Sequence, residues 1–202
     1  MPADSAGSVR PRPSDELQAV AIEQFAANGF SGTSLQQIAD VAGYSKSSVL
    51  YHFASKEALL DAVLTPAIDD LERILDAWLS DTEADAARAA FLEAFVDFLL
   101  RYRLEVHTFI NQAQSLGDMP VVARANDIIV RLSDAVCPPG ASTEDRLRFG
   151  MALGGSAYTL AAGITYSGEE LAPVDELRTA LIRIISDLLS PVPAHAVPAP
   201  TR

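Results

Sequence analysis

Cysteine, lysine and histidine are scarce in this sequence, and their scarcity excludes several kinds of site. The single cysteine, Cys137, cannot form an internal disulfide and favours a reducing compartment. The three histidines are scattered, and the chain has neither a metal-ligand spacing nor a phosphate-binding glycine loop. We therefore expect no cofactor, no metal and no enzymatic activity.

A clear membrane signal is also missing. Residues 149–168, FGMALGGSAYTLAAGITYSG, carry no charge over about the length of one membrane-spanning helix. They contain five glycines and several hydroxyl residues, which favours a helix buried in protein. The N-terminal segment MPADSAGSVRPRP lacks the apolar centre of a secretory signal. We expect a cytoplasmic protein with no membrane partner.

Positive charge is low overall and unevenly distributed. The formal net charge is −12, and an acidic chain of this kind normally argues against a nucleic acid as partner. Residues 1–60, however, carry four cationic side chains against six acidic ones, whereas residues 61–202 carry 11 against 21. Any contact with DNA must therefore lie within the first 60 residues.

The hydrophobic spacing is helical through most of the chain, and no alternating strand pattern extends beyond a few residues. This predicts an all-α protein. Residues 1–13 and 191–202 are rich in proline and alanine and are predicted to be a disordered arm and tail. Pro66 is expected to kink or break the fourth helix. The predicted helices start at residues 14, 34, 45 and 55 and then cover about 83–102, 104–115, 120–136, 142–166 and 174–189.

One short stretch, GYSKSSVLYHFASK at residues 43–56, contains no Asp or Glu although it holds both lysines of the chain. Before it, Ser34 and Gln37 have the spacing of a capping box. Ala39, Gly43 and Val49 have the spacing with which two short helices pack across a glycine turn, which predicts a helix-turn-helix. Such a unit places the start of its second helix in the major groove, where an acidic side chain would be repelled by phosphates.

These residues carry a resemblance to a known family. The segment FAANGF followed by TSLQQIADVAGYSKSSVLYHFASKEALL resembles the DNA-binding domain of the TetR family of bacterial transcriptional regulators. The resemblance implies an N-terminal three-helix domain at 14–60, a helical ligand-binding and dimerisation domain at 61–190, about nine helices in total, and a homodimer. Tyr44 and Leu50 depart from the usual pattern of the family.

The resemblance also implies which side chains contact double-stranded DNA. Arg10 and Arg12 are candidates for a flexible arm in the minor groove. The expected base and phosphate contacts come from the second helix, its N-terminal cap and the third helix with its flanks: Ser34, Gln36, Tyr44, Ser45, Lys46, Ser47, Ser48, Tyr51, His52 and Lys56.

A candidate ligand site lies in the remainder of the chain. His107, Asn111 and Gln114 share one helix face, which is either a partly polar pocket wall or the exposed side of that helix. We expect a mostly apolar small-molecule ligand with one or two polar groups. The full set of candidate ligand residues is Trp78, Phe98, Tyr102, His107, Asn111, Gln114 and Tyr158.

A candidate dimer interface combines the small-residue helix at 149–166 with the last helix, two helices from each copy forming a four-helix interface. Packing within one chain is the alternative. The candidate residues are Gly150, Gly154, Ala157, Ala161, Leu177, Leu181, Ile184, Ile185 and Leu188.

The sequence thus predicts a ligand-responsive repressor that binds a palindromic operator as a homodimer. A helical protein-interaction module and an all-α enzyme are the alternatives. Salt dependence separates DNA binding from an apolar protein contact, because only the first weakens steeply as salt rises.

Overall fold

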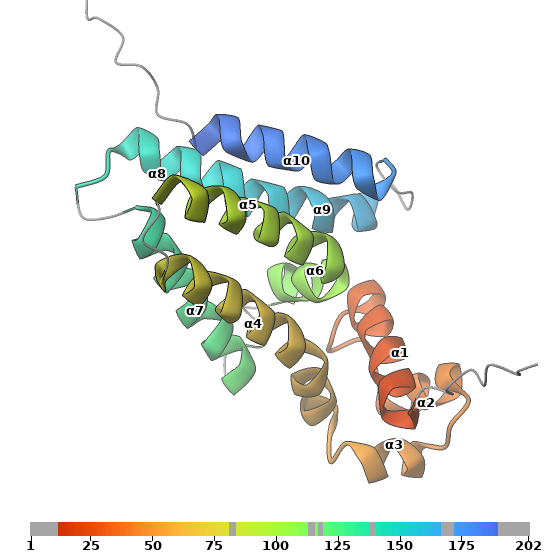
Figure 1. Ribbon diagram of the computed structural model, residues 1–202. Coiled ribbons are helices and arrows are strands. Elements are labelled where there is room, and N and C mark those ends of the chain that lie inside the picture. The colour runs from red at the N-terminus through yellow and green to blue at the C-terminus, as the bar shows by residue number, and fades with distance from the viewer. Residues whose placement is uncertain are drawn as a thin grey trace, which may run out of the picture. The chain divides into compact units, whose positions relative to one another are not determined.

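A computed structural model describes residues 12–80, 84–112, 116, 119–137, 140–166 and 172–189 (Figure 1). Every regular element within these residues is a helix, so the predicted all-α fold is confirmed. The elements are α1 (Pro13–Asn28), α2 (Leu35–Ala42), α3 (Lys46–His52), α4 (Lys56–Ser80), α5 (Ala84–Arg101), α6 (Arg103–Gln112), α7 (Pro120–Val136), α8 (Thr143–Phe149), the π-helical η1 (Gly150–Gly154), α9 (Gly155–Tyr166) and α10 (Val174–Leu189).

The segment from α8 to α9 is one continuous helix with a π-helical turn in its middle. Gly150 and Gly155, at the two ends of that turn, both keep right-handed helical dihedral angles. Counted as one rod, this segment brings the described residues to nine helices, as expected. The π turn itself was not predicted, because hydrophobic spacing does not distinguish it from an ordinary helical turn.

Two compact units make up the fold. The first consists of the chain up to Arg73 together with Tyr102–Ile128, and the second of Ile74–Arg101 together with the chain from Ile129 onward. This division depends on packing contacts, so the predicted functional boundary near residue 60 stays a prediction. Of the predicted terminal segments 1–13 and 191–202, all but Arg12 and Pro13 lie outside the described residues.

The core of the first unit begins with the apolar stripe of α1. Leu17, Ala21 and Phe25 are all fully buried, as their i, i+4, i+8 spacing predicts. Ile38 from α2 and Val49 from α3 are also fully buried, and α1 packs against both α2 and α6. In Figure 1 the short helices α2 and α3 lie beside the red helix α1. The predicted helix-turn-helix is therefore present and has its own apolar centre.

The second unit contains a row of aromatic side chains and a group of packed helices that includes α5, α8, α9 and α10. Trp78, Phe91, Phe95 and Phe98 form a stacked row, with successive ring centroids 4.5, 5.8 and 6.2 Å apart. Helix α10 packs against α5, α8 and η1, and α5 also contacts α9 (Figure 1). No helix among the described residues has the length and apolar character needed to span a membrane.

Helix α4 continues through Pro66, so the expected break is absent, while the expected kink stays a prediction. Proline removes one backbone hydrogen bond from a helix and crowds the preceding turn. Pro66 is exposed, and neighbouring Thr65 donates its hydroxyl hydrogen to the Asp61 carbonyl at 2.7 Å. The helix therefore retains its length although one backbone bond is missing.

Candidate nucleic-acid interface

Local hydrogen bonds define both ends of α2. The Ser34 hydroxyl accepts from the Gln37 amide at 3.2 Å, and the Gln37 side chain accepts from the Ser34 amide at 2.8 Å. This is the capping box that the sequence predicts. At the other end, Gly43 takes a left-handed conformation with φ of 74°, which a side chain would disfavour. The turn that separates α2 from α3 is thus specified by its own residues.

Helix α3 begins at a second serine cap. The Ser45 hydroxyl accepts from the Ser48 amide at 3.1 Å and shares a hydrogen bond with the Ser47 hydroxyl at 2.8 Å. Val49 is fully buried and holds α3 onto the first unit, which leaves the opposite side of the helix in solvent. That exposed side carries Lys46, Ser47 and Tyr51.

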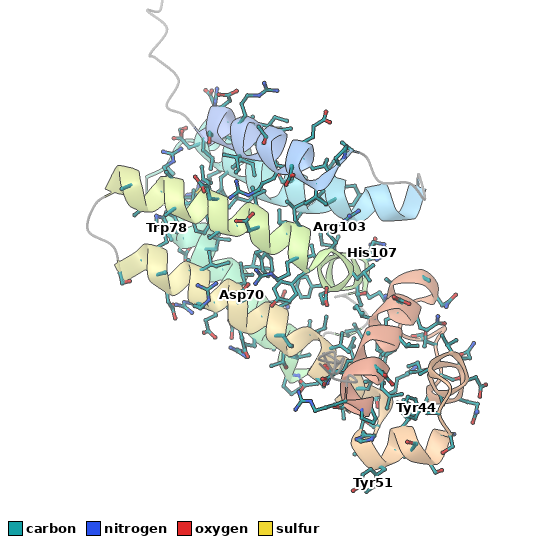
Figure 2. The ribbon with its side chains drawn as sticks, turned by 45° about the vertical axis from the view of Figure 1, so that its right-hand side comes forward. Tyr44, Tyr51, Asp70, Trp78, Arg103 and His107 are labelled. Atoms are coloured by element: carbon teal, nitrogen blue, oxygen red, sulfur yellow. The ribbon has the colours of Figure 1, made fainter. Side chains whose placement is uncertain are left out.

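Tyr51 is the most exposed large apolar side chain among the described residues, with 85% of its surface accessible. Figure 2 shows it at the outer side of α3, directed away from the rest of the first unit. Its ring meets the ring of His52 edge to face at a centroid distance of 5.3 Å. The two aromatic side chains, both predicted to contact DNA, therefore form one exposed group at the end of α3.

Two other predicted DNA contacts already bind acidic side chains. The Gln36 amide on α2 donates to Asp40 at 2.7 Å, so it is exposed but not free to turn without breaking that bond. The exposed Arg12 donates to Asp15 in the first turn of α1 at 3.1 Å, whereas Arg10 lies outside the described residues. Their contacts with DNA stay predictions.

Tyr44 has a partner that the sequence did not predict. Its hydroxyl donates a hydrogen bond to the Glu16 carboxylate on α1, and its side chain is half-buried. This bond ties the α2–α3 turn to α1. The residue that departs from the family pattern thus has a structural contact here, and its predicted contact with DNA stays untested.

Lys56, at the start of α4, also has unpredicted partners. Its ammonium group donates to the carbonyl oxygens of Phe30 at 2.7 Å and Thr33 at 2.8 Å. It lies 4.2 Å from the centroid of the Phe30 ring, within the range of a cation–π contact. These two bonds use two of the three donors of the ammonium, and the predicted contact of Lys56 with DNA stays a prediction. No local signal indicates these contacts, because both carbonyls lie more than 20 residues earlier in the chain.

The candidate ligand residues of the first unit do not share one environment. His107 on α6 is buried, and burial lowers its pKa because a charged imidazolium is poorly solvated there. Asn111 is exposed and its amide donates to the His107 carbonyl of the same helix at 3.0 Å. Tyr102 is half-buried, and Gln114 lies outside the described residues. The polar face predicted from spacing is therefore divided between the protein interior and solvent.

The candidate ligand residues of the second unit differ in the same way. Phe98 is buried at the end of the aromatic row, and Trp78, labelled in Figure 2, is half-buried at its other end. Tyr158 on α9 is 53% exposed. Tyr158 therefore belongs to a surface, while the other two belong to the interior.

The candidate dimer residues are only partly exposed. Ala161, Leu181 and Ile185 are buried within the second unit, as the alternative of packing within one chain predicts. The others reach the surface in part or fully: Gly150, Gly154 and Ile184 are exposed, and Ala157, Leu177 and Leu188 are half-buried.

Helical spacing did not predict that two large apolar side chains of the α8–α9 segment, Leu147 and Met151, are exposed. Leu147 and Met151 are 56% and 61% exposed and follow one another by four residues, with Tyr158 seven residues further on. Ile184 on α10 is 48% exposed. We call these four residues the apolar face. The prediction rested on the glycines of this segment. Its large apolar residues stand in the same stretch of sequence, but spacing alone does not show which of them are exposed.

Part of the chain is similar to known bacterial regulators. Residues 17–63 match the family described as bacterial regulatory proteins of the tetR family. The transcriptional regulator RutR of Escherichia coli K12 is 40% identical over 109 residues, covering 54% of this chain and 48% of RutR. The transcriptional repressor KstR2 of Mycolicibacterium smegmatis is 33% identical over 110 residues, covering 52% of each chain. The chain thus spans about half the length of these curated relatives.

Solved structures extend the similarity of fold to most of the chain. A TetR-family transcriptional regulator from Bordetella parapertussis matches with a TM-score of 0.67 and 22% identity, covering 88% of this chain and 96% of that one. The ketosteroid transcriptional regulator KstR2 of Mycobacterium tuberculosis matches with a TM-score of 0.62 and 21% identity, covering 90% and 97%. Identities this low support the fold and nothing finer.

Proposed function

We propose that this chain, whose residues 17–63 are a TetR-family domain, is a transcriptional repressor that binds a palindromic DNA operator as a homodimer and responds to a small molecule. The observation that carries the proposal is the exposed side of α3, which presents Lys46, Ser47 and Tyr51 without any acidic residue on the helix. The names of the relatives RutR and KstR2, both transcriptional regulators, support the same function. Such a protein acts in the compartment that holds the chromosome, the cytoplasm.

In the proposed complex, the start of α3 enters the major groove. Lys46 and Ser47 contact base edges there, because a helix-turn-helix directs the N-terminal residues of its second helix toward the bases. Tyr51 and His52, at the other end of α3, contact phosphates. Leu50 is 44% exposed and offers an apolar contact, which suits a thymine methyl group.

The proposed dimer uses the apolar face of the second unit. Four large apolar side chains exposed to water are unfavourable, and burial against a second copy would remove that cost. Exposed Gly150 and Gly154 lie on the same helical segment and permit close approach of the partner helix. Two-fold symmetry then presents two α3 helices to successive major grooves, about 34–36 Å apart.

The proposed ligand is mostly apolar with one or two polar groups. Among the described residues, the Thr108 hydroxyl oxygen is buried without a hydrogen-bond partner, next to the buried His107. A buried polar atom without a partner is unfavourable, so a ligand that bonds to it would gain free energy. A ligand that favours one arrangement of α6 changes the population of DNA-binding conformations by its difference in affinity between them.

Selection of genomic fragments by the purified protein tests the proposed function. We expect enrichment of an inverted repeat, and we expect Lys46→Ala/Tyr51→Ala to lose it, with affinity lowered on the order of a hundredfold by the loss of two contacts. Because both side chains are exposed, the double variant should keep the helical circular dichroism and unfolding temperature of the wild type.

The alternatives make different predictions in the same assay. A helical protein-interaction module selects no fragment. If enrichment is seen, raising the salt should reduce it steeply, since phosphate contacts release counterions. Enrichment that is insensitive to salt, or that survives in the double variant, would contradict the assignment of α3 as the DNA-contacting helix.

A further inference from the structure

The turn between α1 and α2 is held by side chains from two helices that are distant in sequence. The Phe30 amide N–H donates to the Gln112 side-chain oxygen, and Gln112 is the last residue of α6. The Phe30 carbonyl oxygen accepts from Lys56 at the start of α4, at 2.7 Å. We call Phe30, Lys56 and Gln112 the Phe30 junction. Both polar backbone atoms of one turn residue are thus bound by side chains from other helices.

Gln112 makes a second bond that determines the orientation of its carboxamide. Its Nε2 donates to the Phe25 carbonyl oxygen in the last turn of α1, at 3.0 Å. Exchanging the amide nitrogen and oxygen would set a donor against the Phe30 N–H and an acceptor against the Phe25 carbonyl. Only one orientation satisfies both partners, so the carboxamide bridges the end of α1 and the turn that follows it.

Further hydrogen bonds fix the backbone of the α1–α2 turn between Phe25 and Phe30, the two residues that Gln112 binds. Gly29, between Phe25 and Phe30, has φ of 76°, and its N–H also donates to the Phe25 carbonyl at 3.0 Å. The Thr33 hydroxyl shares its single hydrogen between the carbonyl oxygens of Gln24 at 3.0 Å and Gly29 at 2.8 Å, and the residue is 3% exposed. Backbone groups that are bonded on all sides leave a turn few alternative conformations.

The same turn leads directly into the helix-turn-helix. Ser34, the N-cap of α2, follows Thr33, whose carbonyl oxygen accepts from Lys56. Helix α3 follows α2 across the left-handed Gly43. A change in the path of the Phe30 turn therefore changes where α2 starts, and through it where α3 lies.

We propose that Gln112 is a positioning residue for DNA binding, whose carboxamide couples the last turn of α6 to the α1–α2 turn and thereby sets the placement of α3. This inference rests on the proposed DNA-binding function. Lys56 at the start of α4 binds the same turn through the Phe30 and Thr33 carbonyl oxygens. In this proposal it affects DNA binding both by holding the turn and by its positive charge. Both hydrogen bonds of the carboxamide depend on the position of the end of α6, so a displacement of that end weakens both together.

The test is Gln112→Met, which keeps the length of the side chain and removes both hydrogen bonds. Gln24→Met is the matched control, because within the described residues the Gln24 side chain bonds only to Asn28 of its own helix, which donates to it at 3.1 Å. Three quantities are measured: amide hydrogen exchange at Phe30, affinity for the selected inverted repeat, and affinity for repeats whose spacer is one base pair longer or shorter.

We expect faster exchange at Phe30 and about tenfold weaker binding in Gln112→Met, and neither effect in Gln24→Met. If α3 is misplaced, the loss of affinity caused by a spacer of the wrong length becomes smaller. A general loss of stability does not change this spacer preference. Wild-type affinity and spacer preference in Gln112→Met overturn the proposal, and so does an equal loss of affinity at every spacing.

Failure of the proposed function is distinguishable from failure of this inference. A wild-type protein that selects no fragment contradicts DNA binding itself. The exchange measurement then still decides on the coupling, since unchanged exchange at Phe30 in Gln112→Met overturns it without any DNA. Gln112→Glu gives a second check, because a carboxylate accepts from Phe30 but cannot donate to Phe25, and we expect an intermediate effect.

Discussion

The starts of α2 and α3 and the end of α10 are stabilised by different kinds of polar contact. Around α2 and α3, neutral side chains cap helix ends within a few residues of themselves, as Ser34 and Ser45 do. At the end of α10, two arginines from other helices donate to the last carbonyls, Arg88 to Leu189 and Arg148 to Leu188. Local caps specify a short motif from its own residues, whereas long side chains from distant helices determine how separate helices meet.

The distribution of charge follows the same difference. On the surface of the second unit Arg178 is paired with Glu93 and Asp97, and the hydrogen bond from Arg178 lowers the pKa of Asp97. Among the described residues helix α3 has no such pair, and its Lys46 is exposed without an acid on the same helix. Arg178 is therefore neutralised by carboxylates of its own unit, while Lys46 stays exposed to solvent.

The largest effect is expected from removing one core phenylalanine in each region. Phe25→Ala and Phe91→Ala each leave a cavity where a buried ring was, and each should lower the free energy of unfolding by about 3–5 kcal/mol. Urea unfolding followed by circular dichroism measures this. Only Phe91→Ala should change the native fluorescence, because Trp78, the single tryptophan, stacks on Phe91 at 4.5 Å. A spectral change in Phe25→Ala alone would contradict this assignment.

A smaller effect is expected from removing one serine cap in each region, and it distinguishes a loss of stability from a loss of DNA affinity. Ser45→Ala and Ser142→Ala each remove the hydroxyl cap of a short helix, α3 and α8, and each should cost about 1 kcal/mol of stability. Ser45→Ala should also weaken operator binding, since it loosens the start of α3, whereas Ser142→Ala should not. Thermal unfolding and fragment binding measure the two properties. Equal losses of DNA affinity in both variants would remove the distinction between the regions.

The smallest effect is a dependence of stability on pH. Burial lowers the pKa of His107, so the unfolded chain binds its proton more readily than the folded chain. Stability from this group is complete above the unfolded value of about 6.5 and is lost as pH falls from there toward the folded pKa. His107→Gln should therefore show a flatter decline in urea midpoint between about pH 7 and about pH 5.

The same comparison has an internal control. Glu105, on the same helix, has a pKa raised by burial, and it is present in both proteins. The difference between the two pH curves therefore reports His107 alone. Parallel curves would show that His107 exchanges its proton equally well in the folded and unfolded chain.

Local signals made the helix-turn-helix predictable residue by residue. The capping box at Ser34, the glycine stop at Gly43 and the buried Val49 all follow from spacing within a few residues, and all three are confirmed. The tertiary contacts of Lys56 and Tyr44 could not be predicted in the same way. Their partners lie more than 20 residues away in sequence, and only packing brings them together.

The second half of the chain was predictable only as helices. Val174–Leu189 and Pro120–Val136 have the expected bounds, because amphipathic spacing predicts helices wherever they lie. Spacing did not tell which apolar residues face inward. Ile185 and Ile184 are neighbours of the same chemistry, yet the first is fully buried and the second is 48% exposed.

The sequence by itself determined the all-α fold, the helix-turn-helix and the absence of acidic residues from the side of α3 that is left in solvent. These depend on caps, turns and helical periodicity, which act between residues close together in the chain. The tertiary structure alone decided that Gln112 and Lys56 bind the same turn, that Asn111 lies outside while His107 lies inside, and which apolar side chains remain uncovered. Those outcomes depend on which helix faces meet, a choice made by packing across the whole chain.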